Sequence, residues 1–270
     1  QTIPILRHPN TAEDSEAVFY FPGCGSERLF SEISLATLAM LRQQPVQTIL
    51  PPGYLCCGYP QTAGGDQAKG QQISTDNRVL FHRVANTLNY LDIKTVIVSC
   101  GTCMDQLLKY EFQRIFPGCR LLDIHEYLME KGVSLNTNES HYIYHDPCHS
   151  PMKTYDPLEV SSTLMGSAVT LSDRCCGEAG TLAVNRPDIS EQIRFRKQEV
   201  LLENISQKNK PAKLLTSCPS CQQGLSRYTP STGLKPTYMV TELAEQTFGK
   251  QWQSEFIDTL KKHPMEHVLL

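Results

Sequence analysis

The sequence lacks long hydrophobic runs and any strong excess of one sign of charge. No stretch approaches the roughly 18–20 apolar residues that a membrane-spanning helix needs, and the first residues do not resemble a signal peptide. Lys and Arg number 25 against 28 Asp and Glu, so the net charge is only −3. We therefore expect a cytoplasmic protein without a transmembrane segment, with peripheral association at the inner membrane as an open alternative, and no nucleic-acid partner.

Two kinds of cofactor motif are also missing. The sequence contains no C-x2-C-x2-C-x3-C-P run, so it does not encode a ferredoxin-type cubane cluster. No G-x-G-x-x-G fingerprint follows a strand-like segment, so no flavin or nicotinamide site is evident. The chain begins at Gln1 rather than Met, and we expect it to be a piece of a longer polypeptide.

Cysteine, in contrast, is abundant, with 11 residues in a chain of 270. Ten of them form one pattern that occurs twice: a single cysteine, then a Cys-Cys-Gly (CCG) motif, then a C-x-x-C motif. The first copy contains Cys24, Cys56, Cys57, Cys100 and Cys103, and the second contains Cys148, Cys175, Cys176, Cys218 and Cys221. The near-constant offset between the copies predicts two related lobes of about 130 residues each.

Short apolar segments precede the cysteines, and helical patterns follow them. In the first copy we predict strands at residues 17–21, before the single cysteine, and at 95–98, before the C-x-x-C motif. In the second copy the corresponding predicted strands are residues 142–144 and 213–216. Strands that alternate with helices predict a parallel sheet with helices on its faces. The predicted fold class is therefore α/β, with two pseudo-symmetric repeats, each a mainly parallel sheet flanked by helices, and cysteine sites at the carboxyl ends of the strands.

The domain boundaries follow from the repeat and from a polar, aperiodic segment at residues 132–140. We predict an arm or linker at residues 1–16, a first CCG lobe at 17–136, a second CCG lobe at 137–249 and a charged tail at 250–270.

Metal binding is the use that best fits these cysteines, with redox thiols and structural disulfides as alternatives. A vicinal pair does not easily form a disulfide with itself, and a C-x-x-C motif at the start of a helix lets two thiolates converge on one ion. Five cysteines per lobe exceed the four ligands of a zinc tetrahedron or of an ordinary cubane cluster. The count favours an iron–sulfur cluster with additional thiolate ligation.

The pattern resembles the CCG cysteine-rich domain, which is found in duplicate in heterodisulfide reductases and in glycolate oxidase iron–sulfur subunits. The resemblance covers residues 17–245 and rests on ten cysteines in register. It implies that each group of five ligates one non-cubane [4Fe-4S] cluster, Cys24, Cys56, Cys57, Cys100 and Cys103 in the first lobe and Cys148, Cys175, Cys176, Cys218 and Cys221 in the second. Zinc in one of the two sites stays an alternative.

The same resemblance implies an oxidoreductase. The chain would be the iron–sulfur domain or subunit of a FAD-dependent dehydrogenase that acts on a 2-hydroxy acid such as lactate or glycolate. FAD would lie on a partner or fused domain, next to a ferredoxin-like iron–sulfur domain, and electrons would pass through the clusters to a quinone or another carrier. Two alternatives stay open: a heterodisulfide reductase-like catalytic subunit that reduces disulfides, and a zinc-holding structural module.

Several polar residues adjoin the second cysteine pattern. His145 and His149 flank Cys148, either as loop histidines that hydrogen-bond to the backbone or as groups that tune a cluster or deliver protons. Arg174 and Glu178 bracket the second CCG motif, either as a surface ion pair or with Arg174 raising the potential of a cluster. Cys119 lies outside both patterns, and we expect a simple thiol there.

Overall fold

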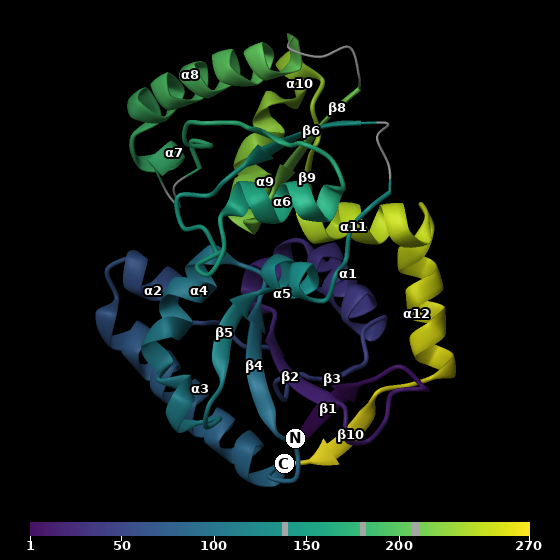
Figure 1. The fold of residues 1–270 in the computed structure, drawn as a ribbon. Helices are drawn as coiled ribbons and strands as arrows, with labels where there is room; N and C mark the ends of the chain where they lie inside the picture. Colours follow the sequence, from purple (N-terminus) through teal and green to yellow (C-terminus); the bar gives the residue numbers. More distant parts are fainter. Residues whose placement is uncertain (137–139, 179–181, 207–210) are drawn as a thin grey trace.

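The computed structural model describes residues 1–136, 140–178, 182–206 and 211–270 and contains two sheets (Figure 1). The larger sheet has the strand order β10-β1-β3-β2-β4-β5, and the smaller one has the order β7-β6-β8-β9. The strands of the larger sheet are β1 (Thr2–Leu6), β2 (Glu16–Phe21), β3 (Val46–Ile49), β4 (Ile93–Val98), β5 (Arg120–Asp123) and β10 (Glu266–Leu269). Those of the smaller sheet are β6 (His141–His145), β7 (Thr170–Leu171), β8 (Ala212–Thr216) and β9 (Pro236–Tyr238).

One parallel four-stranded unit occurs in both sheets. The order β3-β2-β4-β5 in the first sheet corresponds to β7-β6-β8-β9 in the second, and all neighbours within each unit run parallel. The two central strands of each unit end together, because Phe21 pairs with Val98 and His145 pairs with Thr216. The predicted α/β repeats are confirmed, and in each repeat the single cysteine and the C-x-x-C motif follow adjacent strand ends.

Helices cover both faces of each sheet (Figure 1). The layer between the sheets contains α1 (Ser31–Arg42), α5 (Ile124–Glu130), α6 (Pro157–Met165) and α11 (Met239–Phe248). The outer faces carry α3 (Gln67–Thr87) and α4 (Gly101–Leu107) on the first sheet and α8 (Pro187–Ser206) and α9 (Pro219–Leu225) on the second. The remaining α-helices are α2 (Tyr59–Ala63), α7 (Leu182–Asn185), α10 (Thr229–Thr232) and α12 (Trp252–Lys262). No helix in the described ranges is both long and apolar enough to cross a membrane.

Local sequence explains where these helices begin and end. The Asp156 carboxylate accepts hydrogen bonds from the N–H groups of Leu158 and Glu159, and Pro157 occupies the first turn of α6. Asp123 and Glu126 form a capping box at the start of α5. Two helices of the middle layer, α5 and α6, are therefore specified by their own first turns.

The middle helix layer joins the two lobes through one hydrophobic core. Val18 and Tyr127 from the first lobe and Leu164 and Leu243 from the second are fully buried in the same cluster. Such continuous burial is the dominant stabilising contribution to a fold. The lobes are therefore parts of one folded unit.

The predictions of an arm at residues 1–16 and of a charged tail at 250–270 are wrong where these segments form strands and a helix of the fold, namely β1, α12 and β10. Strand β1 pairs antiparallel with β3 and β10, and its side chains Ile3 and Ile5 are fully buried because they alternate onto one face of the sheet. In the tail, Trp252 and Phe256 of α12 pack into the shared core. The two chain ends consequently meet at one edge of the first sheet (Figure 1).

The predicted lobe boundary at residues 136–137 adjoins residues 137–139, which lie outside the described residues. The division of the chain into domains at that position stays a prediction.

Candidate metal centres

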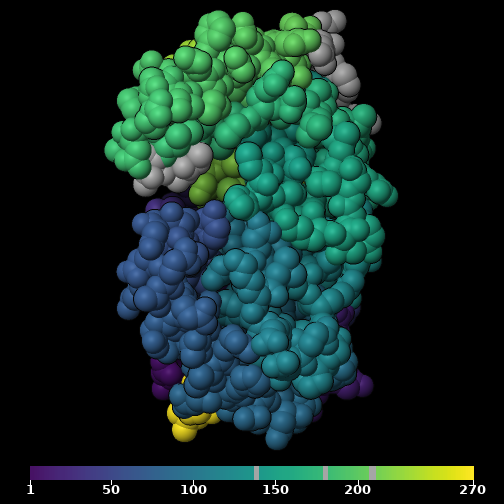
Figure 2. All heavy atoms as spheres, turned by 90° about the vertical axis from the view of Figure 1, so that its left-hand side faces the viewer, coloured from purple at the N-terminus to yellow at the C-terminus, as the bar shows by residue number. Residues whose placement is uncertain are grey.

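The cysteine-bearing loops of both lobes lie at the interface between the lobes. Gly101, at the start of α4, approaches the loop of the second lobe so closely that a Cβ atom there would lie 1.4 Å from the carbonyl oxygen of His149. Gly25, just after Cys24, approaches α9 in the same way, since its Cβ would lie 2.9 Å from Pro219. Each lobe's single-cysteine loop therefore packs against the C-x-x-C helix of the other lobe, and Figure 2 shows a recess between the lobes on one side.

In the first lobe the structure brings all five predicted cysteines together. Cys56 interacts with the thiols of both Cys24 and Cys57, Cys57 interacts with Cys103, and Cys103 interacts with Cys100. We call these five residues the first cysteine set.

Neighbouring thiols favour the ionised form at two of these positions. Hydrogen bonds from Cys24 and Cys57 lower the pKa of the Cys56 thiol to about 3, and a hydrogen bond from Cys103 lowers the pKa of Cys100 to about 6. Thiolate sulfur is the form that binds soft metal ions. The first cysteine set is therefore a group of converging sulfur donors.

In the second lobe four of the five predicted cysteines are in contact. The Sγ atoms of Cys176 and Cys221 lie 3.4 Å apart, Cys176 also interacts with Cys175, and Cys221 interacts with Cys218. Cys148 is exposed and acts on Cys175 electrostatically. We call these five residues the second cysteine set, in which Cys148 lies at the rim.

The glycine of each CCG motif has a conformational role. Gly58 and Gly177 have φ values of 90° and 81°, a region that side chains rarely permit. In this turn the N–H of Gly58 donates to Sγ of Cys56 at 3.5 Å, and the N–H of Gly177 donates to Sγ of Cys175 at 3.4 Å. The motif thus directs a backbone donor at a cysteine sulfur in both lobes.

Buried tyrosines, which the sequence analysis did not single out, hold the cysteine motifs in place. The hydroxyl of Tyr110 donates to the carbonyl oxygen of Cys57 at 2.8 Å, and that of Tyr228 donates to the carbonyl oxygen of Cys176 at 3.0 Å. Tyr228 follows Tyr110 at the offset that separates the two C-x-x-C motifs. The repeat therefore contained the signal that could have identified this pair.

A further tyrosine joins the two lobes. The hydroxyl of Tyr238, which is fully buried, lies 2.6 Å from the carbonyl oxygen of Ser99 and 3.0 Å from that of Ser217, and its single hydrogen is shared between them. Ser99 and Ser217 immediately precede the C-x-x-C motifs of the first and second lobes. One hydroxyl group therefore links the backbones that carry both motifs.

His149 contacts the first lobe through its ring. Its Nδ1 lies 2.5 Å from Oδ2 of Asp105, and its Nε2 lies 3.4 Å from the hydroxyl of Tyr59. The expectation that this histidine hydrogen-bonds to the backbone is not met, because its ring partners are side chains across the interface.

The predicted ion pair between Arg174 and Glu178 is wrong. Arg174 lies 3.8 Å from Asp173, whereas Glu178 pairs with Arg227 at 2.8 Å. The reason is geometric, since the turn at Gly177 separates the two side chains and the 3-10 turn at Ser226–Tyr228, directly after α9, brings Arg227 to Glu178. Cys119 is buried among the apolar residues on the outer face of the first sheet, as expected for a simple thiol.

His145 and Lys197 distinguish the second site from the first. A ring nitrogen of His145 and the Sγ atoms of Cys176 and Cys221 all lie within 4.8 Å of one another. Lys197 is fully buried on α8, and its Nζ lies 3.0 Å from Nδ1 of His145. His145 is a predictable candidate because it adjoins Cys148 in the sequence, whereas Lys197 is not, because a lysine in a charged helix has no local signal of burial.

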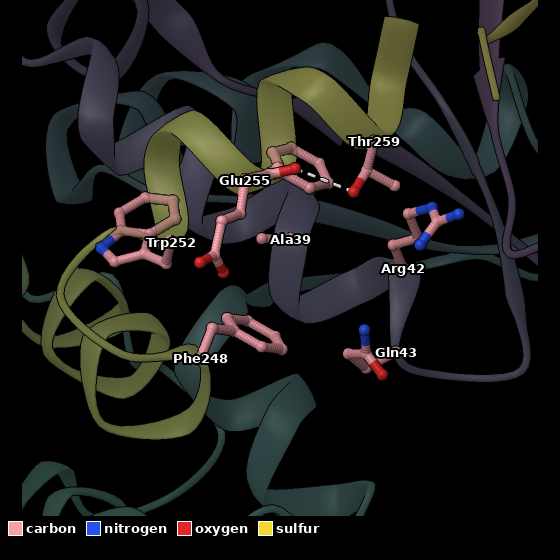
Figure 3. A pocket seen from close by; sticks show the side chains of 8 residues that line it. Ala39, Arg42, Gln43, Phe248, Trp252, Glu255 and Thr259 are labelled. Atoms are coloured by element: carbon pink, nitrogen blue, oxygen red, sulfur yellow. Dashed lines mark hydrogen bonds between the residues drawn. The ribbon is translucent and has the colours of Figure 1, made fainter. Parts of the chain in front are cut away.

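A surface pocket is lined by residues that belong to neither cysteine set (Figure 3). It lies between α1 and α12, where Arg42, Phe248 and Trp252 are among its lining residues, and the hydroxyl of Thr259 donates to the carbonyl oxygen of Glu255. None of its lining residues is a cysteine or a histidine. The cysteine sets are therefore the better candidates for chemistry.

The donor chemistry of both sets fits a thiophilic metal centre. Each set consists of sulfur atoms from three separate loops, in mutual contact apart from Cys148, with ionised thiols stabilised within it. Sulfur donors select zinc, copper(I) and iron–sulfur clusters over magnesium or calcium.

Comparison with known proteins gives consistent matches. The cysteine-rich domain family matches residues 18–108 and 142–226, and a domain of unknown function matches residues 226–270. The glycolate oxidase iron–sulfur subunit of Escherichia coli is 30% identical over 262 residues, which cover 92% of this chain and 60% of that protein.

Two further relatives have lower sequence identities. One of the subunits of the fumarate reductase (CoM/CoB) of Methanothermobacter marburgensis is 25% identical over 212 residues, covering 75% of this chain and 40% of that protein. An uncharacterized iron–sulfur protein of Methanococcus maripaludis is 27% identical over 229 residues, covering 81% of this chain and 43% of that protein. The chain thus spans only about two fifths to three fifths of the length of these relatives.

The matched segments comprise more than half of the chain and contain both C-x-x-C motifs and both CCG motifs. The relatives with assigned roles are subunits of oxidoreductases, and the one from Escherichia coli is an iron–sulfur subunit. With two sets of converging thiols at the strand ends of two matching repeats, the chain belongs to the cysteine-rich (CCG) domain family.

Proposed function

We propose that this chain is the iron–sulfur domain of a FAD-dependent oxidoreductase that oxidises a 2-hydroxy acid such as lactate or glycolate. The carrying observation is the first cysteine set, in which five thiols are in contact although zinc needs at most four ligands. The relative named as a glycolate oxidase subunit supports the substrate class. We infer that FAD and a ferredoxin-like iron–sulfur domain lie on a partner or a fused segment, and that a quinone or another carrier accepts the electrons.

In this proposal each cysteine set holds one [4Fe-4S] cluster of the non-cubane type, and the cluster supplies a one-electron donor and acceptor site. The protein's contribution is to position the sulfur ligands and to limit access of water. Cys57, Cys100 and Cys103 are buried, and the Gly58 N–H donates to the sulfur of Cys56. Hydrogen bonds to sulfur and burial are two of the means by which proteins set the potential of such a centre.

Metal analysis of anaerobically purified protein tests the proposal. We expect about eight irons and matching sulfide per chain, and about four of each after Cys56→Ser or Cys175→Ser. Cys119→Ser is the matched control, because Cys119 is a buried cysteine outside both sets, and it should retain all the iron. Iron-free protein after anaerobic reconstitution would contradict the proposal, as would equal loss of iron in the Cys119 control.

A second function is favoured by the reciprocal packing of the cysteine loops. Because the loop of each single cysteine packs on the C-x-x-C helix of the other lobe, both sets lie along one interface. A disulfide bound there could receive two electrons and two protons and leave as two thiols, as in a heterodisulfide reductase-like subunit. Adding candidate thiols to the reduced protein should then change the spectra of both clusters, and unchanged spectra would reject this function.

The zinc alternative applies most directly to the second lobe. One nitrogen of His145 and the sulfur atoms of Cys176 and Cys221 lie within 4.8 Å of one another, and structural zinc accepts such a donor set. The same metal analysis distinguishes this case, since it would yield about four irons and one zinc per chain.

A further inference from the structure

Lys197 is a buried lysine whose amino group is surrounded by acceptors. Its Nζ lies 3.0 Å from the carbonyl oxygen of Ser172, 2.6 Å from that of Asp173, 2.9 Å from the hydroxyl of Ser172 and 3.0 Å from Nδ1 of His145. Carbonyl oxygens can only accept, so the N–H groups of Lys197 must donate to them. The geometry fits an ammonium group, whose three N–H groups serve these four neighbours with one N–H shared between two of them.

This ammonium group determines which nitrogen of His145 carries a proton. An ammonium nitrogen has no acceptor site, so Nδ1 of His145 accepts from it and the hydrogen of the neutral ring is on Nε2. A ring whose Nδ1 accepts from an ammonium group carries its one N–H hydrogen on Nε2 and is neutral. Nε2 is buried and has no hydrogen-bond partner among the described residues, and a ring nitrogen of His145 lies within 4.8 Å of the sulfur atoms of Cys176 and Cys221. The Nε2–H group is therefore available to donate to cysteine sulfur.

The first lobe has no such pair at the equivalent positions. Phe21 ends β2 three residues before Cys24, as His145 ends β6 three residues before Cys148. Asn77 corresponds to Lys197. In the first lobe Gly70 of α3 contacts the glycine of the CCG motif, and Asn77 lies seven residues further along the helix. In the second lobe Ser190 of α8 makes the equivalent contact, and Lys197 lies seven residues after it.

The two equivalent helix positions bind different partners. The amide of Asn77 donates to the carbonyl oxygen of Cys56 at 2.7 Å and to the hydroxyl of Tyr110 at 3.0 Å. Phe21 packs on Phe81 in an edge-to-face contact. The first lobe therefore has the apolar ring of Phe21 where the second lobe has the N–H donor of His145. It has the neutral amide of Asn77 where the second lobe has the positive charge of Lys197.

We propose that Lys197 and His145 act together as positioning residues that make the second cysteine set the site of higher reduction potential. The inference rests on the proposed function, since it requires a cluster in each lobe. Reduction adds one negative charge to a cluster that thiolates already make negative. A nearby ammonium group and an N–H···S hydrogen bond both stabilise that added charge, and both raise the potential. In a protein that has received one electron, that electron would then reside mainly on the cluster of the second lobe.

The test is a redox titration of the intact chain, purified anaerobically, with each cluster followed by electron paramagnetic resonance. Cys56→Ser and Cys175→Ser first assign the two midpoint potentials to their lobes. Lys197→Asn and His145→Phe then introduce the residues of the first lobe at the equivalent positions. Each variant should lower the reduction potential of the second site by at least about 59 mV, which corresponds to a tenfold change in a one-electron equilibrium constant. The reduction potential of the first site should not change.

Two further variants separate this role from a structural one. His145→Gln keeps an N–H donor and should restore most of the lost potential relative to His145→Phe. If Lys197→Asn does not fold, the two His145 variants still provide the comparison. Iron content should stay at the wild-type value in every variant that tests the pair.

Three results would overturn the inference. The second site could titrate below the first in the wild-type protein, the variants could leave both potentials in place, or they could shift both equally. A wild-type protein with zinc or no metal in the second lobe would instead reject the proposed pair of clusters, and with it the basis of the inference.

Discussion

In the first lobe, Phe21 and Asn77 occupy the positions that His145 and Lys197 occupy in the second. Around these positions the lobes agree closely, because Tyr110 and Tyr228 bind the same carbonyl oxygen of their CCG motifs and both motif glycines have positive φ. The features that hold the cysteine backbone are thus duplicated. The side chains next to sulfur differ, and the comparison indicates that a duplicated scaffold can retain its geometry while its two sites acquire different electronic properties.

The lobes also differ in what surrounds their sheets. The first sheet gains β1 and β10, whereas the described part of the second sheet consists of the four-stranded unit alone. Cys24 is partly buried while Cys148 is exposed. The first site is consequently the more enclosed of the two, and the second is the more accessible to a partner or a substrate.

The largest expected effect concerns the core that the lobes share. Leu243→Ala removes a fully buried side chain from α11 and should lower the free energy of unfolding by about 2–5 kcal/mol. Because both lobes contribute to this core, they should still unfold in one transition, measured by circular dichroism and by the fluorescence of Trp252. Leu202→Ala on α8 is the control, since that side chain is 44% exposed and its loss should have little effect. Two separate transitions, with only the second lobe destabilised, would contradict a shared core.

A smaller effect sharpens the comparison of the CCG motifs. Tyr110→Phe and Tyr228→Phe each remove a buried hydrogen bond to a motif carbonyl and should each lower the free energy of unfolding by about 1 kcal/mol. Tyr110→Phe should cost more, because the amide of Asn77 also loses an acceptor. Chemical denaturation measures both, with Tyr90→Phe as an exposed control. A larger cost for Tyr228→Phe would show that the two motifs are held differently.

The smallest expected effect is a pH dependence at the lobe interface. Glu130 accepts hydrogen bonds from the guanidinium of Arg120 and from the hydroxyl of Tyr155, and Arg120 lowers the pKa of Glu130. A carboxyl group with a lower pKa in the folded state stabilises that state above its unfolded pKa, and the stabilisation is lost as the pH falls through the folded pKa.

Wild-type protein should therefore lose more stability than Glu130→Gln as the pH falls from about 5, just above the usual glutamate pKa of about 4.3, to about 3. Arg120 is half exposed, so screening by solvent should keep the difference below about 1 kcal/mol. Thermal unfolding at several pH values measures it, with Glu191→Gln as the exposed control. Identical pH profiles of stability for wild type and Glu130→Gln would show that the Arg120–Glu130 ion pair does not contribute to the stability of the interface.

Much of the candidate site could be predicted because its signals are local. Cys56-Cys57-Gly58 is a turn whose glycine requirement is visible in three residues, and C-x-x-C after an apolar run predicts a strand followed by a helix. The tyrosines of the repeat were equally visible, since Tyr228 follows Tyr110 at the offset of the neighbouring cysteines, but a tyrosine in a helical pattern does not by itself indicate which carbonyl oxygen it binds.

Other features depend on contacts between distant residues. Thr2–Leu6 became a strand because β3 and β10 provide partners, and β10 lies at the opposite end of the chain. Lys197 reaches His145 across 52 residues of sequence, and only the packing of α8 on the second sheet brings them together.

The duplication, the α/β class, the order of the cysteines and their places after the strands could all be read from the amino-acid sequence, because each of these follows from spacing and from local backbone preference. Four features emerged only from the folded chain: the lobes share one core, the chain ends complete the first sheet, Tyr238 links both C-x-x-C motifs and Lys197 faces the second site. These are outcomes of long-range packing, in which a side chain's partner depends on how whole elements meet rather than on its neighbours in the chain.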